Sequence, residues 1–206
     1  AIYLVGDIFD FWFEYKKVVP KGFIRLLGKL ASLTDNGTAI HLFVGNHDLW
    51  MKDYLKTEVG VTIHYKNIII EESNKKLFIG HGDGLGAGDY FYKFVRKIFT
   101  SKLCQWSFAR LHPNLALTLA HAWSRSSRRS GREEKFISNE KEILFGYCKD
   151  QQGLNPVDYY IFGHRHLPLE LKVDDRAKYI NIGDWLHHYT YAVFENGEVE
   201  LKTYKK

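Results

Sequence analysis

The sequence is poor in cysteine and lacks long hydrophobic runs, and both shortages limit what it can be. Only two cysteines occur among its 206 residues, Cys104 and Cys148, and their separation matches no zinc-ligand or redox spacing. A cysteine-based structural zinc site is therefore excluded. The thiols are predicted to be free and buried in a reducing compartment, with a disulfide as the alternative. No apolar run approaches the ~18 residues that a membrane-spanning helix requires.

Acidic residues are outnumbered by basic ones. The chain carries 29 Lys and Arg against 24 Asp and Glu, a formal net charge of +5, and much of the excess lies in residues 93–97 and 125–132. A basic balance suits an acidic partner such as nucleic acid, an anionic membrane surface or a phosphorylated substrate. The hydrophobic content of 45% is that of an ordinary globular protein.

Four apolar, strand-like runs each end at a glycine, and a metal-binding type of residue follows it. The four junctions are Gly6-Asp7 after Ile2–Val5, Gly45-Asn46-His47-Asp48 after Ile40–Val44, Gly80-His81 after Leu77–Ile79, and Gly163-His164-Arg165-His166 after Tyr159–Phe162. A short apolar run bounded by glycine predicts a strand buried on both faces. Glycine lets the backbone turn sharply and approach a ligand closely. We therefore expect four strands to deliver Asp, Asn and His side chains from their carboxyl ends into one crevice.

The remaining pattern predicts one α/β domain over residues 1–206, interrupted by a helical insertion over residues 84–150. Before the insertion we expect a helix at residues 20–32 and, after the second strand, a small β meander at residues 59–79. The insertion is predicted to begin at an N-cap on Asp89 and to hold four helices, the last over residues 133–150. Short strands then return between residues 159 and 203.

The donor types at the four junctions indicate a transition-metal site. Imidazole favours transition metals, and carboxylate and carboxamide oxygens suit the harder end of that series, so Mn²⁺, Fe or Zn²⁺ fits better than Ca²⁺. A pair of such ions can clamp a phosphoryl group and activate a water. Asp10 and Asp48, which lie beside the candidate ligands, are predicted to orient them rather than to bind metal.

Taken in order, these four motifs resemble those of the calcineurin-like metallophosphoesterases. The resemblance covers nearly the whole chain outside the helical insertion. It implies a β-sandwich flanked by helices (αββα) that binds two divalent metal ions. By resemblance, Asp7 bridges the two ions. The site of one ion is completed by Asn46, His81 and His164. The second ion is bound by His166. His47 is implied to be the catalytic residue that stands near the leaving group, as an acid or a phosphate-orienting group.

One motif of that family is absent from the sequence. An Asp-x-His motif on the first strand should precede Gly6-Asp7, but the chain begins at Ala1, inside the strand and without an initiator Met. We therefore expect an N-terminal piece to be missing. As written, the chain holds one nearly complete metal site and part of a second, so its activity is predicted to be impaired.

A narrower resemblance points to one branch of the family. Residues 6–12, the run His81-Gly82-Asp83 with Leu85, and the basic, aromatic insertion resemble the UDP-2,3-diacylglucosamine pyrophosphohydrolases of lipid A synthesis. This implies hydrolysis of a lipidated UDP-sugar at the α-phosphate, giving UMP and 2,3-diacylglucosamine 1-phosphate, with Mn²⁺ as the metal. It also implies a helical lid over the acyl chains and a cytoplasmic protein held peripherally on the anionic face of the inner membrane, with no nucleic-acid partner. Many members have Arg where His47 stands, so another phosphoester substrate stays open.

The insertion supplies the candidate substrate-binding residues. Phe91–Phe99 follows the spacing of one apolar helix face, which suits either a core helix or an acyl-lined lid. Basic side chains that can contact substrate phosphate or anionic headgroups are Lys93, Arg96, Arg125, Arg128 and Arg129. Two rival functions remain: a phosphodiesterase of the same fold acting on another nucleotide or phospholipid, and a non-catalytic basic module that binds nucleic acid or membranes. The sequence carries no signal for an oligomeric state.

Overall fold

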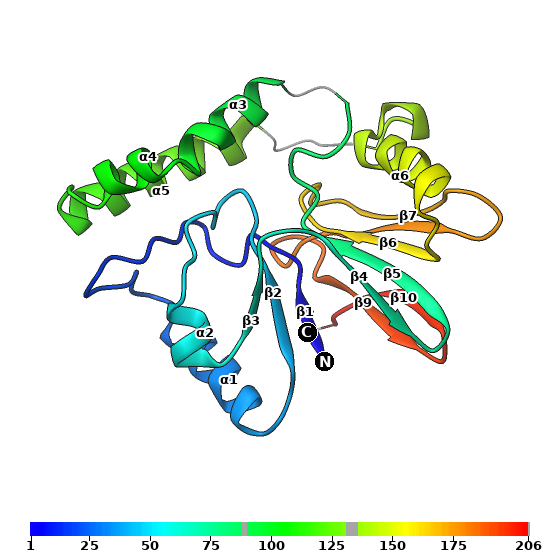
Figure 1. Ribbon diagram of the computed structural model, residues 1–206, viewed down its shortest axis with the longest axis horizontal. Helices are drawn as coiled ribbons and strands as arrows, with labels where there is room; N and C mark the ends of the chain where they lie inside the picture. The colour runs from blue at the N-terminus through cyan, green and yellow to red at the C-terminus, as the bar shows by residue number, and fades with distance from the viewer. Residues whose placement is uncertain (88–89, 131–135, 206) are drawn as a thin grey trace. The chain divides into compact units, whose positions relative to one another are not determined.

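The protein has a mixed α/β fold (Figure 1). A computed structural model describes residues 1–87, 90–130 and 136–205, without the side chains of Phe91 and of residues 125–130. The chain divides into two compact units. The first unit comprises Ala1–Tyr65 and Asp89–Arg132, and the second comprises Lys66–Gly88 and Glu133–Lys206.

The first unit is built on a three-stranded parallel sheet. Its strands are β1 (Ile2–Leu4), β2 (Ile40–Phe43) and β3 (Thr62–His64), in that order. Helix α1 (Ile24–Asp35) connects β1 to β2, and helix α2 (Tyr54–Val59) connects β2 to β3. Buried aliphatic side chains of both helices pack with those of β2 in one hydrophobic cluster, which includes Leu27, Leu30, Ile40, Leu42 and Leu55. Because parallel strands need such crossovers, the sheet directs all its carboxyl ends to the same edge.

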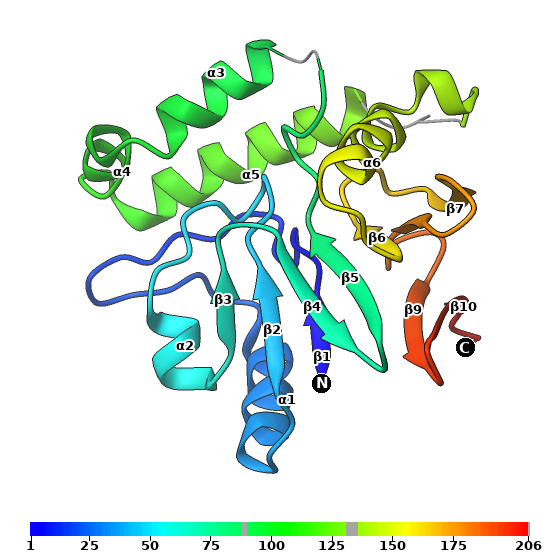
Figure 2. The ribbon, with the colours of Figure 1, turned by 45° about the vertical axis from the view of Figure 1, so that its right-hand side comes forward.

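Three further helices belong to the first unit. They are α3 (Tyr90–Phe99), α4 (Lys102–Phe108) and α5 (Pro113–Ser130), and α3 runs beside α5 with α4 at the turn between them (Figure 2). Rings of these helices contact the loops that follow β1 and β2. The Phe108 ring centroid lies 4.7 Å from that of Trp50 and 4.8 Å from that of Phe13. Aromatic packing therefore fastens the helices to the first unit.

The second unit contains a five-stranded mixed sheet of order β4-β5-β6-β8-β7. Its strands are β4 (Ile68–Glu72), β5 (Lys75–Gly80), β6 (Tyr159–Phe162), β7 (Pro168–Lys172) and β8 (Lys178–Ile182). The three central strands, β5, β6 and β8, are parallel, and the edge strands β4 and β7 are antiparallel to their neighbours. The carboxyl ends of the three central strands consequently meet at one edge.

The remaining elements of the second unit are one helix, one 3₁₀ turn and one hairpin. These are α6 (Ile143–Leu154), η1 (Asn139–Lys141), and the antiparallel strands β9 (Thr190–Glu195) and β10 (Glu198–Thr203). Helix α6 buries Leu144, Phe145 and Cys148 against Tyr160 and Tyr179 of the sheet. The unit thus has its own hydrophobic core.

The sequence predicted the strands well but was wrong about one grouping. Residues 59–79 do not form a meander, because β3 pairs with β2 in the first unit whereas β4 and β5 pair in the second. Helix α2 was not predicted, and α6 begins at Ile143 rather than at residue 133. The N-cap predicted at Asp89 lies outside the described residues.

Two other expectations can be compared with the structure. Both cysteines are free, as predicted, but only Cys148 is fully buried, whereas Cys104 is half-buried. Within the described ranges, no helix combines the length and the apolar character needed to cross a membrane. The helices found within residues 84–150 divide between the units, α3–α5 in the first and α6 in the second. A single domain with an insertion over residues 84–150 stays a prediction.

Candidate active site

The first unit brings two of the four predicted junctions together. The pairing of Leu4 with Leu42 sets the turn after β1 beside the turn after β2. A Cβ atom on Gly45 would overlap the carboxylate of Asp7, so only glycine admits this approach. The backbone N–H of His47 donates a hydrogen bond of 2.8 Å to Asp7 Oδ1. Asn46, which lies between Gly45 and His47 in the chain, is half-buried.

Asp48 ties the same two turns together. Its carboxylate is fully buried and accepts hydrogen bonds from the backbone N–H of Gly45 at 2.7 Å and of Ile8 at 2.9 Å. A buried carboxylate that accepts several backbone N–H groups holds the donating segments firmly. Asp48 therefore has the geometry of an orienting residue. Asp10, the other residue predicted for that role, is exposed.

His47 contacts helix α5 of the first unit. Its Nδ1 lies 3.1 Å from Oγ of Ser124 on α5, and Ser124 is buried at 3% exposure. Analysis of the sequence missed this partner. The two residues are 77 positions apart, and no local pattern marks a serine in a helix as the neighbour of a distant histidine.

The second unit brings the other two junctions together. Gly80 pairs with Phe162 in the register of β5 and β6, and the N–H of Gly163 donates to the carbonyl oxygen of His81 at 3.1 Å. The rings of His81 and His164 meet edge to face with centroids 5.2 Å apart. A ligand nitrogen of one lies within 4.8 Å of a ligand nitrogen of the other. This spacing suits two imidazoles that bind the same ion.

Three of the predicted ligands have a left-handed backbone. Asp7, His164 and His166 have φ angles of 52°, 65° and 51°. The other described non-glycine residues with positive φ are Ser73, Asn74, Tyr189 and Asn196, of which three lie in hairpin turns. Such a conformation costs about 1–3 kcal/mol per residue and tends to gather at functional sites. Neither hairpin geometry nor glycine explains it at Asp7, His164 and His166, which supports their selection for a site.

A buried polar network supports the loop that carries His164 and His166. Arg165, between them, donates from Nε to Oε2 of Glu142 at 3.1 Å, and Glu142 is only 3% exposed. The Tyr179 hydroxyl donates to the other Glu142 oxygen at 3.4 Å, and burial followed by the Glu142 charge raises the pKa of Tyr179, so its donor proton is retained. Glu142 and Tyr179 therefore hold the loop through Arg165, which lies between His164 and His166.

Asn181 secures the start of the same loop from β8. It is fully buried, and its Nδ2 donates to the carbonyl oxygen of Gly163. Its Oδ1 accepts from the N–H of Gly183 at 3.2 Å. Sequence analysis missed Asn181, although it stands in β8, a further strand that is followed by a glycine and an aspartate, Gly183 and Asp184. That recurrence of the strand-glycine-Asp pattern was the available signal.

The predicted substrate-binding residues are less completely placed. Lys93 and Arg96 are half-buried on α3, and Lys93 Nζ lies 5.8 Å from the ring centroid of Tyr90. Arg125, Arg128 and Arg129 belong to α5, but their side chains lie outside the described part of the chain. Substrate contact by all five remains a prediction.

The donor chemistry of these loops fits a divalent transition metal. The second unit offers two neighbouring imidazoles and a third from His166, and the first unit offers a carboxylate and a carboxamide. Imidazole nitrogens favour transition metals, and carboxylate and carboxamide oxygens suit the harder members of that series. The polar partners behind them, Asp48 and Glu142, resemble the outer hydrogen bonds that orient ligands in metal sites.

Comparison with known proteins identifies clear relatives. No family model matches the chain. The UDP-2,3-diacylglucosamine hydrolase of Porphyromonas gingivalis is 39% identical over 217 residues, which cover 98% of this chain and 83% of that protein. The hydrolase of the same name from Edwardsiella ictaluri is 33% identical over 170 residues, covering 82% and 64%. Among solved structures, zinc-bound Vps29 from Entamoeba histolytica aligns over 98% of this chain and 97% of its own with 13% identity and a TM-score of 0.38, a likeness that supports no conclusion.

Proposed function

Because this chain belongs to the UDP-2,3-diacylglucosamine hydrolase family, we propose that it is an enzyme that hydrolyses UDP-2,3-diacylglucosamine. The observation that carries the proposal is an identity of 39% that extends over 98% of the chain. A non-catalytic basic module is set aside, since the family is one of hydrolases. The substrate is a lipidated UDP-sugar, whose diphosphate and acyl chains make separate demands on the protein.

The reaction is the hydrolysis of a phosphoric anhydride. Water adds to the α-phosphorus, and the bond from that phosphorus to the bridging oxygen breaks. The water oxygen leaves with UMP, and the bridging oxygen leaves with 2,3-diacylglucosamine 1-phosphate. One proton of the water is released to the surroundings or to a base. No oxidant or second substrate is needed.

The proposed metal ligands are the five donors at the four strand ends, Asp7, Asn46, His81, His164 and His166. A divalent ion held by these residues would supply a nucleophilic water near neutral pH and would neutralise charge on the phosphoryl group. We propose that the site holds two ions and that the native metal is Mn²⁺. Their support is the mixed donor set and the left-handed backbone of three of the five residues.

His47 is the proposed catalytic side chain. It follows Asn46 directly, and its backbone N–H is bonded to the Asp7 carboxylate, so its position depends on the turns that carry two proposed ligands. A histidine so placed can donate a hydrogen bond to a phosphate oxygen or to the leaving oxygen. General acid catalysis of this kind contributes about 10²–10⁴-fold to a rate.

The substrate proposal is tested with matched lipidated and plain substrates. Purified protein is stripped of metal with EDTA and then supplied with Mn²⁺, and UMP release is measured with UDP-2,3-diacylglucosamine and with UDP-N-acetylglucosamine. We expect Mn²⁺-dependent release from the lipidated substrate alone. Equal turnover of the plain sugar, or turnover only of other phosphodiesters, would favour the phosphodiesterase alternative. No turnover with Mn²⁺, Fe²⁺ or Zn²⁺ would refute the proposal.

The helices of the first unit are proposed to meet the lipid. Large apolar side chains with more than half of their surface exposed recur along them, namely Tyr90, Phe94, Leu103, Trp106, Leu115, Leu119 and Trp123. On α5 the exposed residues repeat every four positions, whereas Ala116 and Ala120, one position further along, are buried. A stripe of this size directed outward marks an interaction surface rather than a core. Its occupant is proposed to be the hydrocarbon of the substrate and of the membrane that presents it.

Charge supports an anionic membrane as the partner. Lys97, Lys102 and Arg110 are exposed on or beside the same helices, and each basic residue near an anionic surface contributes about 1 kcal/mol to binding. Co-sedimentation with vesicles of phosphatidylcholine, with and without phosphatidylglycerol, tests this association. We expect binding that depends on phosphatidylglycerol and is weakened in Leu119→Ser and Trp123→Ser. The matched control Ile69→Ser, an exposed apolar position on β4, should bind as the unaltered protein does.

A further inference from the structure

We propose that Ser124 is a positioning residue for His47, so that the helical segment takes part in orienting the catalytic side chain as well as contacting lipid. This inference rests on the catalytic role proposed for His47. The contact that carries it joins Ser124 Oγ to His47 Nδ1 at 3.1 Å. Both residues lie within the first unit.

The setting of Ser124 indicates that its hydroxyl has a specific task. Ala116, Ala120 and Ser124 form the buried stripe of α5, with exposures of 0%, 9% and 3%. Alanine would fill the third position of this stripe as it fills the other two. A buried hydroxyl instead requires hydrogen-bond partners, and Nδ1 of His47 is one of them.

The loop of His47 is fastened to the helices at a second point. Trp50 Nε1 donates to the carbonyl oxygen of Phe99, at the end of α3, over 2.6 Å. The backbone of His47 is bonded to Asp7. The segment from His47 to Trp50 is therefore held at one end by the His47 main chain and at the other by the Trp50 side chain. What remains free in such a loop is the rotation of the imidazole.

Ser124 restricts that rotation. An imidazole has two nitrogens, and the bond made by one decides which tautomer the other presents. With Nδ1 engaged by the Ser124 hydroxyl, Nε2 is the nitrogen left for substrate. When the hydroxyl donates to Nδ1, Nε2 carries the proton and can donate to a phosphate or leaving-group oxygen. Loss of the hydroxyl would leave the backbone of the loop in place but release the ring.

Kinetics of paired variants test this role. Ser124→Ala removes the hydroxyl, Ser124→Thr keeps it, and Thr118→Ala removes a hydroxyl on the same helix that bonds to the carbonyl of Asn114. We expect kcat to fall about 3- to 10-fold in Ser124→Ala, the worth of one hydrogen bond, with KM unchanged. Ser124→Thr and Thr118→Ala should retain kcat. An unchanged kcat in Ser124→Ala, or an equal fall in Ser124→Thr, would overturn the proposal.

A double-mutant cycle separates action through His47 from a merely structural role. In a His47→Ala background, Ser124→Ala should lower kcat no further, because residues that act as a unit are not additive. A full additional loss there would overturn the proposal. Thermal unfolding of each variant shows whether a lost hydroxyl has also destabilised the fold.

A measurement without substrate keeps this inference distinguishable from the proposed function. The ring ¹⁵N resonances of His47, assigned by their absence in His47→Ala, report its tautomer. We expect them to shift in Ser124→Ala and to stay in place in Thr118→Ala. Unmoved resonances would refute the positioning role even in an active enzyme. If the resonances shift but no UDP-2,3-diacylglucosamine is hydrolysed, the proposed function fails and the contact stands.

Discussion

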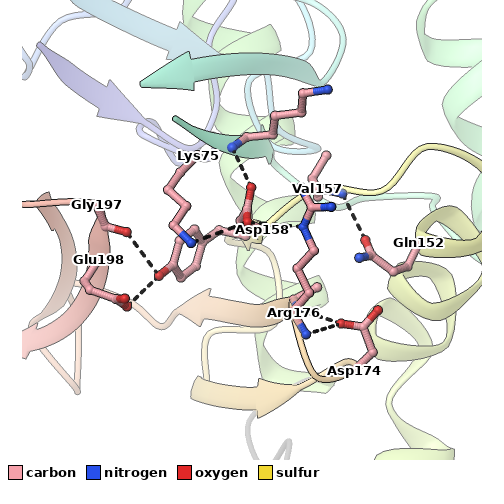
Figure 3. Close-up of polar contacts among 11 residues, drawn as sticks. Lys75, Gln152, Val157, Asp158, Asp174, Arg176, Gly197 and Glu198 are labelled. Atoms are coloured by element: carbon pink, nitrogen blue, oxygen red, sulfur yellow. Dashed lines mark hydrogen bonds and ion pairs between the residues drawn. The ribbon is translucent and has the colours of Figure 1, made fainter. Parts of the chain in front are cut away.

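The two ends of the sheet in the second unit are built on opposite principles. At the amino end of β6, Asp158 accepts a hydrogen bond from the Lys76 N–H at 2.9 Å and lies 3.6 Å from Lys75 Nζ and 3.4 Å from Arg176 Nε (Figure 3). At the carboxyl end, His164 and His166 occupy left-handed backbone conformations. At the amino end, neighbouring groups neutralise the charge of Asp158. At the carboxyl end, His164 and His166 are held in a strained backbone conformation.

The amino end has the character of a structural staple. Burial by itself raises the pKa of the Asp158 carboxyl, but the Lys76 hydrogen bond and the charges of Lys75 and Arg176 outweigh it and hold the pKa below 3.8. Nearby, the Tyr159 hydroxyl donates to Glu198 at 2.6 Å, and burial together with this bond raises the pKa of Tyr159 to about 12. These groups keep one protonation state across the neutral range and so contribute stability rather than chemistry.

The carboxyl end has the character of a site. The rings of His81 and His164 meet edge to face, the Arg165 side chain is bonded to Glu142, and the Gly163 carbonyl is bonded to Asn181. Backbone strain persists only where the surroundings over-determine it. The comparison teaches that polar burial by itself does not locate function in this protein. We propose that polar burial combined with left-handed backbone marks the site, and the following substitutions test one end of the sheet against the other.

The largest effect is expected from His164. Replacement of His164 by Ala or by Asn should lower Mn²⁺-dependent UMP release by more than about 100-fold, since loss of an outer partner of a metal ligand already costs 10–100-fold. The two variants should differ in stability, because Asn tolerates positive φ better than Ala does. Activity assays and thermal unfolding measure the two effects. An active His164→Ala variant would contradict the assignment of this end as the site.

Metal removal should lower the stability of the protein only when the residues at the carboxyl end of the sheet are intact. Saturation with Mn²⁺ at 100 times its Kd stabilises a folded protein by about 2.7 kcal/mol. We expect Mn²⁺ to raise the Tm of the unaltered protein and of Asp158→Asn by the same amount, as measured by scanning calorimetry. His164→Ala should show a much smaller rise. Equal rises in all three proteins would mean that the metal binds elsewhere.

Glu142→Gln is expected to have an intermediate effect. It removes the negative charge that Arg165 contacts but keeps the size of the side chain, so the loop should loosen without losing a ligand. We expect metal affinity, measured by isothermal titration calorimetry, to weaken about 10-fold, the lower end of the range for outer partners. Glu170→Gln, which breaks an exposed ion pair with Lys178, is the matched control and should leave the affinity unchanged.

The smallest effect on activity is expected from Asp158→Asn. Loss of its charge should lower the free energy of unfolding by about 1–3 kcal/mol while kcat stays the same. Because the folded pKa of Asp158 is depressed, its stabilisation is present above the ordinary carboxyl pKa of 3.8 and is lost as the pH falls through the folded value. Urea unfolding at pH 7 and near pH 3 should therefore show a difference between the two proteins that shrinks in acid. A difference independent of pH would contradict this account.

Much of the fold was predictable because its signals are local. Each of the four apolar runs forms a strand, and each strand ends at its glycine or no more than two positions before it, since a continuous buried run and a following glycine act on the chain directly. The failed meander shows the limit of such signals. Residues 59–64 and 67–71 look alike as β-forming segments, but the choice of partner strand depends on residues far along the chain.

The candidate site was likewise predictable where its signals are local and not where they depend on distant residues. The glycine-ligand spacing selected Asp7, His164 and His166 without knowledge of their backbone, and all three have a left-handed backbone. Ser124, Glu142 and Asn181 escaped prediction because a helical serine, a glutamate before a helix and a buried strand asparagine each have ordinary explanations. Their partners lie 77, 23 and 18 positions away.

The sequence by itself determined most of the strands and helices, the candidate donor residues and the family to which the chain belongs, since these depend on residue types at short spacing and on similarity along the chain. The tertiary structure alone decided which junctions lie side by side, which buried groups hold them and which helix reaches His47. These outcomes depend on strand register and on the burial of polar groups that need a partner. The chain meets both requirements only after distant segments have packed together.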